Sequence, residues 1–263
     1  MSEQPMIQSV AKAMHLLELL SQARSPLTLT ELHLRTGWPR STIFGLLSTM
    51  REYRVVSQWP DGRYALGLRL FEFGCSVSSV WDISAVAEPY LQRLAARNEG
   101  TAVLSVYDGG QVMALAQAES RAGMRVVVEI GMELPLHATS QGKLFLSAMR
   151  PAAVQKRLAE KPMALYTPHT IQDMEQLEQE LSAIRAQGYA VEDGEYKIGL
   201  RSVSAPIYAS DGQMRYALSL VGMFRRVSSR EFLQATQDAV AAAAQISAAL
   251  GFRGAQNPLD KNV

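Results

Sequence analysis

The stretch from Thr28 to Tyr53, TLTELHLRTGWPRSTIFGLLSTMREY, constrains the fold of this 263-residue chain more than any other segment. Thr28 and Glu31 have the spacing of a capping box, in which a threonine hydroxyl and a carboxylate each bond an amide at a helix start. Gly37 suits the left-handed residue that ends a helix, and Pro39 suits the first position of the next helix. The stretch therefore predicts two short helices joined by a tight turn, which is typical of a helix-turn-helix.

The second of these helices is predicted to have one buried stripe, formed by Ile43, Leu46, Leu47 and Met50. A recognition helix needs such a packed inner face together with an outer face that can reach base edges or phosphates. An amphipathic helical hairpin inside a protein core would give the same pattern and stays an alternative at this point. The candidate DNA-binding residues of this region are Thr28, Arg40, Ser41, Thr42, Phe44, Gly45 and Ser48.

A predicted hairpin follows at once, in the segment RVVSQWPDGRYALG. Two β-prone runs flank Pro60-Asp61-Gly62, which is a turn sequence because proline fixes φ and glycine tolerates a positive φ. Arg63 lies near the tip, where its guanidinium could contact the DNA backbone or a minor groove. Helix, turn, helix and hairpin in this order predict a winged helix-turn-helix over residues 7–67, and this makes the simple helical hairpin the weaker interpretation.

Composition excludes several classes of protein. The chain is 48% hydrophobic and 19% charged, which is ordinary for a soluble globular protein. No apolar run reaches the roughly 18 residues that would cross a bilayer, and the N-terminus has no signal-peptide pattern, so we expect a cytoplasmic protein without a membrane partner. The single cysteine, Cys75, and four scattered histidines give no metal-ligand spacing, so we expect neither a metal nor a cofactor.

Two features of the N-terminal region suggest a homo-oligomer: its low net charge and the apolar face of the helix predicted over residues 7–23. Residues 1–67 hold seven basic and five acidic side chains, a net charge of +2, so one protomer would neutralise few phosphates. The predicted apolar stripe of helix 7–23 contains Ile7, Val10, Ala11, Met14 and Leu17, and it is widened by Leu16 and Leu20. Such a broad face predicts packing on both the helix-turn-helix and a second copy of the chain, although deep burial within one domain would also explain it.

The remainder alternates predicted strands and helices. A linker helix is expected over residues 68–80, and a helix over 81–97. Strands are expected over 101–108, 111–119, 124–130, 189–193, 202–208 and 214–222, and helices over 142–148, 152–161, 171–187 and, after a capping box of Ser228 and Glu231, up to Gly251. The predicted fold class is α+β with a mostly antiparallel sheet. The predicted domains are 1–67, the linker 68–80, 81–251, and a disordered tail over 252–263.

The chain resembles the IclR family of bacterial transcriptional regulators along nearly its whole length. Three motifs carry the resemblance beyond the winged helix: LPLHATSQGKLFLSAM (134–149), GYAVEDGEYKIGLRSVSAPIYASDGQ (188–213) and ALSLVG (217–222). The resemblance implies a GAF-like C-terminal domain that binds a small-molecule effector. It also implies homodimers joined through the DNA-binding domains and, in many members, a dimer of dimers on double-stranded operator DNA.

The resemblance also implies the effector-binding residues Ser140, Gln141, Gly142, Glu192, Ser202, Ser219 and Val221. Amides at a helix start bind anions, so the first three independently suggest a carboxylate-bearing effector. Helix capping alone would explain Ser140 equally well. Two positions depart from the family: Gly45 stands where a basic residue is common, and Ser202 stands where cysteine or a small residue is frequent.

The predicted function is a ligand-responsive transcriptional regulator, more often a repressor than an activator in this family, and not an enzyme. One alternative is an enzyme whose C-terminal domain uses His137, Lys143, Asp193 or Glu195 as acid–base groups. No nucleophile elbow or phosphate loop supports that alternative. A second alternative is a pure ligand-binding module with a vestigial DNA-binding domain, which the glycine at position 45 would suit.

Overall fold

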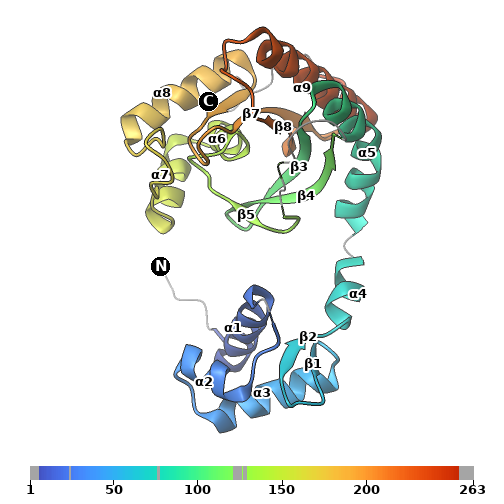
Figure 1. Ribbon diagram of the computed structural model, residues 1–263, viewed down its shortest axis with the longest axis vertical. Coiled ribbons are helices and arrows are strands. Elements are labelled where there is room, and N and C mark those ends of the chain that lie inside the picture. The colour runs from blue at the N-terminus through green and yellow to red at the C-terminus, as the bar shows by residue number, and fades with distance from the viewer. Residues whose placement is uncertain (1–5, 24, 76–77, 121–125, 127–128, 255–263) are drawn as a thin grey trace. The chain divides into compact units, whose positions relative to one another are not determined.

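Two compact units, Met1–Trp81 and Asp82–Val263, make up the chain in a computed structural model. The structure describes residues 6–23, 25–75, 78–120, 126 and 129–254 (Figure 1). The sequence indicates a finer division of the chain, into residues 1–67, 68–80, 81–251 and 252–263, and these limits stay a prediction. Of the predicted tail, Phe252 is packed, since its ring stacks on Tyr208 with centroids 5.0 Å apart, and residues 255–263 lie outside the described residues.

The N-terminal unit is a winged helix-turn-helix. Its elements are α1 (Gln8–Gln22), α2 (Leu29–Thr36), α3 (Arg40–Glu52), β1 (Val56–Gln58), β2 (Tyr64–Leu66) and α4 (Arg69–Cys75). Strands β1 and β2 pair antiparallel, and Leu27 adds a bridge to Tyr64. Apolar residues from α1, α2, α3 and the hairpin form one core, whose fully buried members include Leu16, Leu32, Ile43 and Leu47.

Local rules explain how α2 and α3 begin and end. The capping box is present: the Thr28 amide donates to Glu31 Oε2 at 2.7 Å, and the Glu31 amide donates to Thr28 Oγ1 at 3.2 Å. Gly37 ends α2 with φ of 70°, as expected for a left-handed C-terminal residue. Pro39 was predicted to be the first helical residue and is instead the N-cap, so α3 starts one residue later, at Arg40.

Helix α1 packs only part of its broad predicted apolar face on the rest of its unit. Leu16 and Leu20 are buried in the core, whereas Ile7, Val10 and Met14 of the predicted stripe are each more than half exposed. This agrees with a face too broad for one partner, of which one part was expected to pack on the helix-turn-helix. Packing of the other part on a second copy of the chain stays a prediction. The exposed residues recur at helical spacing, so the N-terminal half of α1 presents an apolar surface.

The C-terminal unit is an antiparallel sheet between two groups of helices (Figure 1). The strands are β3 (Thr101–Asp108), β4 (Gln111–Glu119), β5 (Glu133–Leu134), β6 (Ala190–Asp193), β7 (Arg201–Tyr208) and β8 (Met214–Gly222), in the order β5-β4-β3-β8-β7-β6. The helices are α5 (Ser78–Asn98), α6 (Ser140–Ser147), α7 (Pro151–Glu160), α8 (Met174–Gln187) and α9 (Arg230–Ala249).

Strand alternation divides the core of this unit into two layers. Leu104, Val203 and Leu218 pack with residues of α5 and α9 on one face of the sheet. On the other side, Leu144 of α6 and Leu181 of α8 belong to a second cluster. Because successive strand residues point to opposite faces, the residues between those of the first layer face α6.

Two sequence predictions need correction here. The N-cap of α9 is Ser229, not Ser228: its hydroxyl accepts the Phe232 amide at 3.2 Å, and the residue three places on is Phe232, so no reciprocal capping box forms. The strand predicted over 124–130 falls largely outside the described residues, and Val126, Glu129 and Ile130 are not in a strand.

Candidate functional site

The outer face of α3 combines short residues with the longer side chains of Arg40 and Phe44. Ile43, Leu47 and Met50 are buried in the core, which fixes the rotation of the helix. That packing leaves Arg40, Ser41, Phe44 and Gly45 exposed, with Thr42 and Ser48 half-buried beside them. Within the described part of the chain, the Arg40 side chain has no hydrogen-bond or ion-pair partner. The six predicted contact residues of α3 therefore share the accessible surface of one helix.

Two further DNA-binding candidates have their polar groups engaged within the protein. The Thr28 hydroxyl belongs to the capping box, where it also donates to Glu31 Oε2 at 2.7 Å. The Arg63 guanidinium contacts Asp61 Oδ2 at 3.3 Å and donates to the Pro26 carbonyl at 3.3 Å. Arg63 lies on the hairpin as predicted, but it would have to leave these partners to reach a phosphate.

The predicted effector residues of the sheet lie in neighbouring positions of adjacent strands. Glu192 of β6 pairs with Ser202 of β7, which pairs with Val221 of β8. Two residues further along β7, Ser204 pairs with Ser219 of β8. Since residues two apart on a strand share a face, Ser202 and Ser204 both point toward α6.

A chain of buried hydroxyl groups joins these strands to the start of α6. Ser140 Oγ lies 2.7 Å from Ser202 Oγ and 2.6 Å from Ser204 Oγ, and Ser204 Oγ lies 2.7 Å from Ser219 Oγ. At its other end, the Ser202 hydroxyl donates to Glu192 Oε2 at 3.2 Å. The sequence prediction missed Ser204, although its position two residues after Ser202 was a usable signal.

The start of α6 is capped by Thr139 and not by Ser140. The Thr139 hydroxyl accepts the Gly142 amide at 3.1 Å, so one of the three amides expected to bind an anion is already bonded. A Cβ at Gly142 would lie 2.3 Å from the Leu136 carbonyl oxygen, and for this reason only glycine fits. Because Thr139 provides the cap, the Ser140 hydroxyl is free to join the buried chain.

A narrow cavity with a free volume of about 50 Å³ lies over this part of the sheet. Of the predicted effector residues, Gln141, Glu192, Ser202 and Val221 line it, whereas Ser140, Gly142 and Ser219 are buried and not among its lining residues. The remaining lining residues were not predicted: Val126, Met132, Leu134, Thr139, Tyr196, Lys197 and Leu200. They come from loops and short elements that carry no periodic signal.

The electrostatics of the cavity centre on Glu192, whose exposed fraction is 3%. Burial raises the pKa of Glu192 to about 7, against the lowering effect of the hydrogen bond that the Tyr196 amide donates to Oε1 at 3.1 Å. The nearby Glu195 carboxylate raises that pKa further. Lys197 is exposed and supplies the one cationic side chain among the described residues that line the cavity.

Lys143 is a fully buried cation beneath this site. Its ammonium lies 2.6 Å from Glu195 Oε1 and 2.9 Å from Glu180 Oε1, and its exposed fraction is 1%. Burial raises the pKa of Glu195, and the Lys143 charge works in the opposite direction. This ion pair connects α6, α8 and the loop after β6, and so supports the segment that carries Gln141.

Sequence comparisons identify both units. Residues 9–60 match the profile of the IclR helix-turn-helix domain, and residues 75–248 match that of the bacterial transcriptional regulator IclR C-terminal domain. The chain belongs to the IclR family. It is 30% identical over 249 residues to the HTH-type transcriptional regulator XynR of Escherichia coli, covering 94% of this chain and 99% of XynR. It is 31% identical over 248 residues to the acetate operon repressor of Salmonella typhimurium, covering 93% and 90%.

Solved IclR structures share the fold. An IclR transcriptional regulator from Alicyclobacillus acidocaldarius superposes with a TM-score of 0.79 at 29% identity, over 94% of this chain and 100% of that one. An IclR homologue from Microbacterium hydrocarbonoxydans, complexed with 4-hydroxybenzoate, superposes with a TM-score of 0.81 at 24% identity, over 92% and 98%. The predicted family and the α+β fold class with its winged helix are therefore confirmed, and the function is that of an IclR-type DNA-binding transcriptional regulator.

Each acid–base group of the enzyme alternative has a partner within this IclR chain. His137 Nε2 lies 2.9 Å from the Ala164 carbonyl, and burial lowers the pKa of this histidine. Asp193 pairs with Arg201 at 2.6 Å, and Lys143 pairs with Glu195. The relatives named above are regulators. Among the residues that the structure describes, no group of three or more His, Cys, Asp and Glu side chains could hold a metal ion, and no helix could span a membrane.

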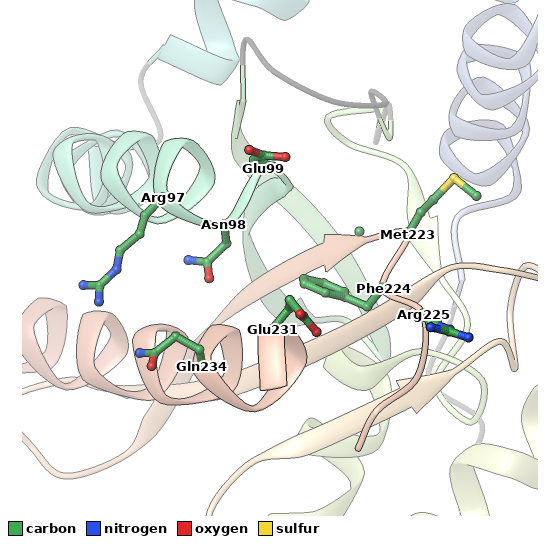
Figure 2. Close-up of a pocket in the computed structure, with 9 residues that line it drawn as sticks. Arg97, Asn98, Glu99, Met223, Phe224, Arg225, Glu231 and Gln234 are labelled. Carbon is green, nitrogen blue, oxygen red and sulfur yellow. The ribbon is translucent and has the colours of Figure 1, made fainter. Parts of the chain in front are cut away.

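A larger and more open groove lies elsewhere on the C-terminal unit (Figure 2). Its volume is about 670 Å³, and it lies between the end of α5, the end of β8 and the start of α9. Its charged side chains, Arg97, Glu99, Arg225 and Glu231, are all exposed, and Arg97 already pairs with Asp238 at 3.0 Å. Neither sign of charge dominates, so the narrow cavity remains the better candidate for ligand binding.

Proposed function

We propose that this IclR-family protein is a repressor that binds operator DNA through α3 and the β1–β2 hairpin and is modulated by a small effector in the narrow cavity. One observation carries this proposal. Glu192, Ser202 and Val221 lie side by side on three strands and line one cavity together with Gln141 of α6. They do so in a chain whose other unit leaves the outer face of its recognition helix exposed.

The proposed DNA-binding form is a homodimer in the cytoplasm, with a dimer of dimers as a further possible assembly. The exposed apolar residues Ile7, Val10 and Met14 on α1 support a second copy as the partner. Burial of a fully exposed side chain of this kind contributes roughly 1.5–3 kcal/mol, so covering these residues would favour association of two protomers. Two DNA-binding units on one site would also offset the small net charge of each.

The proposed effector is a small molecule with a carboxylate and a hydrogen-bond donor. Lys197 is a cation at the cavity and Glu192 is a buried acceptor, so the two ends of the molecule would face different partners. The Microbacterium homologue was crystallised with 4-hydroxybenzoate, which has this combination of groups. The small free volume favours a compact molecule over a large one.

The test combines DNA binding and ligand binding on the full chain. Fluorescence anisotropy with the duplex that flanks its own gene measures operator affinity, and a panel of small carboxylic acids is screened by calorimetry. Arg40→Ala should weaken DNA binding, reduce the salt slope by about 1 and leave effector binding unchanged. Glu192→Gln should leave DNA binding without effector unchanged and reduce the effector response.

Arg150→Ala is the matched control, because it removes the same charge from an exposed position of the C-terminal unit. Equal operator affinity for Arg40→Ala and Arg150→Ala would place the DNA-binding face elsewhere. An unchanged effector response in Glu192→Gln would place the effector site outside the narrow cavity.

A further inference from the structure

The outer surface of α3 combines one large apolar side chain with a ridge of small ones. The exposed fraction of Phe44 is 52%, although the same helix buries Ile43 and Leu47 completely. Next to it, Ser41, Gly45 and Ser48 follow at spacings of four and three residues, which places them on one line along the helix. That line lies opposite the buried face, so it is the part of α3 that can come closest to another molecule.

Gly45 is not required by the protein's own structure. It adopts no positive φ, and a Cβ built on it would meet nothing within 4 Å. An alanine would fit there and would be the better helix former. Its neighbour Thr49 directs its hydroxyl back to the Gly45 carbonyl, at 3.0 Å, so that group does not extend outward. The glycine in this ridge is therefore not needed for packing of the core, and its small size affects only the accessible surface of α3.

Phe44 stands beside this ridge and, unlike Ile43 and Leu47, is not part of the core of its unit. The ring has no donor and no acceptor, so it cannot read the hydrogen-bond pattern of a base pair. In the major groove, the apolar group that distinguishes one base pair from another is the C5 methyl of thymine. Arg40, exposed one turn earlier, has a charge suited to a phosphate and would hold the helix in register.

We propose that Phe44 is a specificity-determining residue that reads a thymine methyl group in the operator, while Gly45 and its serine neighbours let α3 approach the bases closely. This inference rests on the proposed function, since it assigns a base preference to the same DNA-binding face. A cytosine methylated at C5 presents the same methyl group in the major groove. Phe44 would therefore favour 5-methylcytosine over cytosine at the position that it contacts.

The experiment starts from the operator that the full chain selects out of a random-sequence duplex library. Each thymine of that operator is then replaced by deoxyuridine, which keeps base pairing and removes only the C5 methyl. At one symmetric pair of positions, the wild type should lose about fourfold in affinity per methyl, the factor that corresponds to burial of one such group. In Phe44→Ala the ratio of affinities for thymine and deoxyuridine at these positions should fall to about one.

Phe71→Ala is the matched control, because Phe71 is likewise an exposed phenylalanine of the same unit, with an exposed fraction of 65%, and lies on α4. It should keep the wild-type ratio even if its absolute affinity changes. The inference is overturned if deoxyuridine has no effect at any position, or if Phe44→Ala keeps the wild-type ratio. Failure to select any sequence would be a different result, because it would overturn the proposed DNA-binding function itself and this inference with it.

Discussion

The two functional regions of this protein differ in how far apart their residues lie in the sequence. The proposed DNA-binding face is carried by α3, thirteen consecutive residues whose inner side is held by Ile43 and Leu47. The proposed effector cavity instead takes residues from α6, β5, β6, β7, β8 and neighbouring loops. One region is set by the rotation of a single helix, and the other by the pairing register of several strands.

This difference has a consequence for how each region tolerates change. A Cβ added at Gly45 on the outer face of α3 meets nothing within 4 Å, whereas several groups at or beside the cavity are bonded to residues dozens of positions away. Ser140 and Ser204, for example, are 64 residues apart and their oxygens lie 2.6 Å from each other. The same type of substitution should therefore be costly near the cavity and inexpensive on α3.

The largest expected effect is that of Lys143→Met. It removes a buried cation and leaves the carboxylates of Glu195 and Glu180 without it, so the free energy of unfolding should fall by about 3–5 kcal/mol. Denaturant unfolding of the full chain measures this change. Lys156→Met, at an exposed position of α7, should change stability by less than about 0.5 kcal/mol. Similar values for the two variants would contradict the assignment of Lys143 as a buried ion-pair residue.

The next effect is a dependence of stability on pH that Glu192 causes. Its pKa is about 7 in the folded chain and 4.5 in the reference state, so well below pH 4.5 Glu192 is protonated in both states and does not affect the free energy of unfolding. Between pH 4.5 and pH 7, Glu192 is largely ionised in the unfolded chain but still largely protonated in the folded chain. The wild type should then lose up to about 3 kcal/mol of stability relative to Glu192→Gln. Unfolding curves of both proteins at pH 5 and pH 8 check this, and a constant difference between them would refute it.

A smaller loss is expected for Gly142→Ala. Its new methyl group would lie 2.3 Å from the Leu136 carbonyl oxygen, so α6 or the segment before it must move. Overpacking of this kind costs about 1–3 kcal/mol. Thermal unfolding gives the change in stability, and effector affinity should fall with it because the adjacent Gln141 lines the cavity. A neutral result would mean that the cavity wall is looser than its contacts indicate.

The smallest effect, with the opposite sign, is expected for Gly45→Ala. A Cβ there meets nothing within 4 Å, and alanine is favoured over glycine in a helix interior by up to about 1 kcal/mol. The N-terminal unit should therefore become slightly more stable, as measured by the same thermal unfolding experiment. Destabilisation would show that this position of α3 is constrained in a way that the open surface does not reveal.

Sequence reasoning succeeded where local rules decide the structure. The capping box of Thr28 and Glu31, the left-handed Gly37 and the turn at Gly62, where φ is 83°, each depend on a few neighbouring residues. For α1, the sequence predicted a broad apolar face but not which part of it α3 and β2 cover. Ser229 replaced Ser228 as the N-cap of α9 because two adjacent serines offer the same signal.

For the cavity, the predicted residues came largely from the resemblance to the IclR family, and local patterns added little. Tyr196 and Lys197 lie in a loop without periodicity, and their place at the cavity follows from where β6 and β7 pair. Ser204 could have been found from its spacing to Ser202. Its contact with Ser140 could not, because nothing in the sequence sets the distance between α6 and β7.

The buried hydroxyl chain has a collective property. Each serine has a single hydrogen, so an ionised Glu192 that accepts from Ser202 requires Ser140 to donate to Ser202, Ser204 to Ser140, and Ser219 to Ser204. The single hydrogen of the Ser140 hydroxyl is then used in the bond to Ser202. Gln141 must therefore present its amide nitrogen, and not its oxygen, to the Ser140 hydroxyl. A proton gained by Glu192 allows all four donors to reverse together. An ionised Glu192 on β6 thus fixes the direction in which the Ser219 hydroxyl on β8, two strands away, donates.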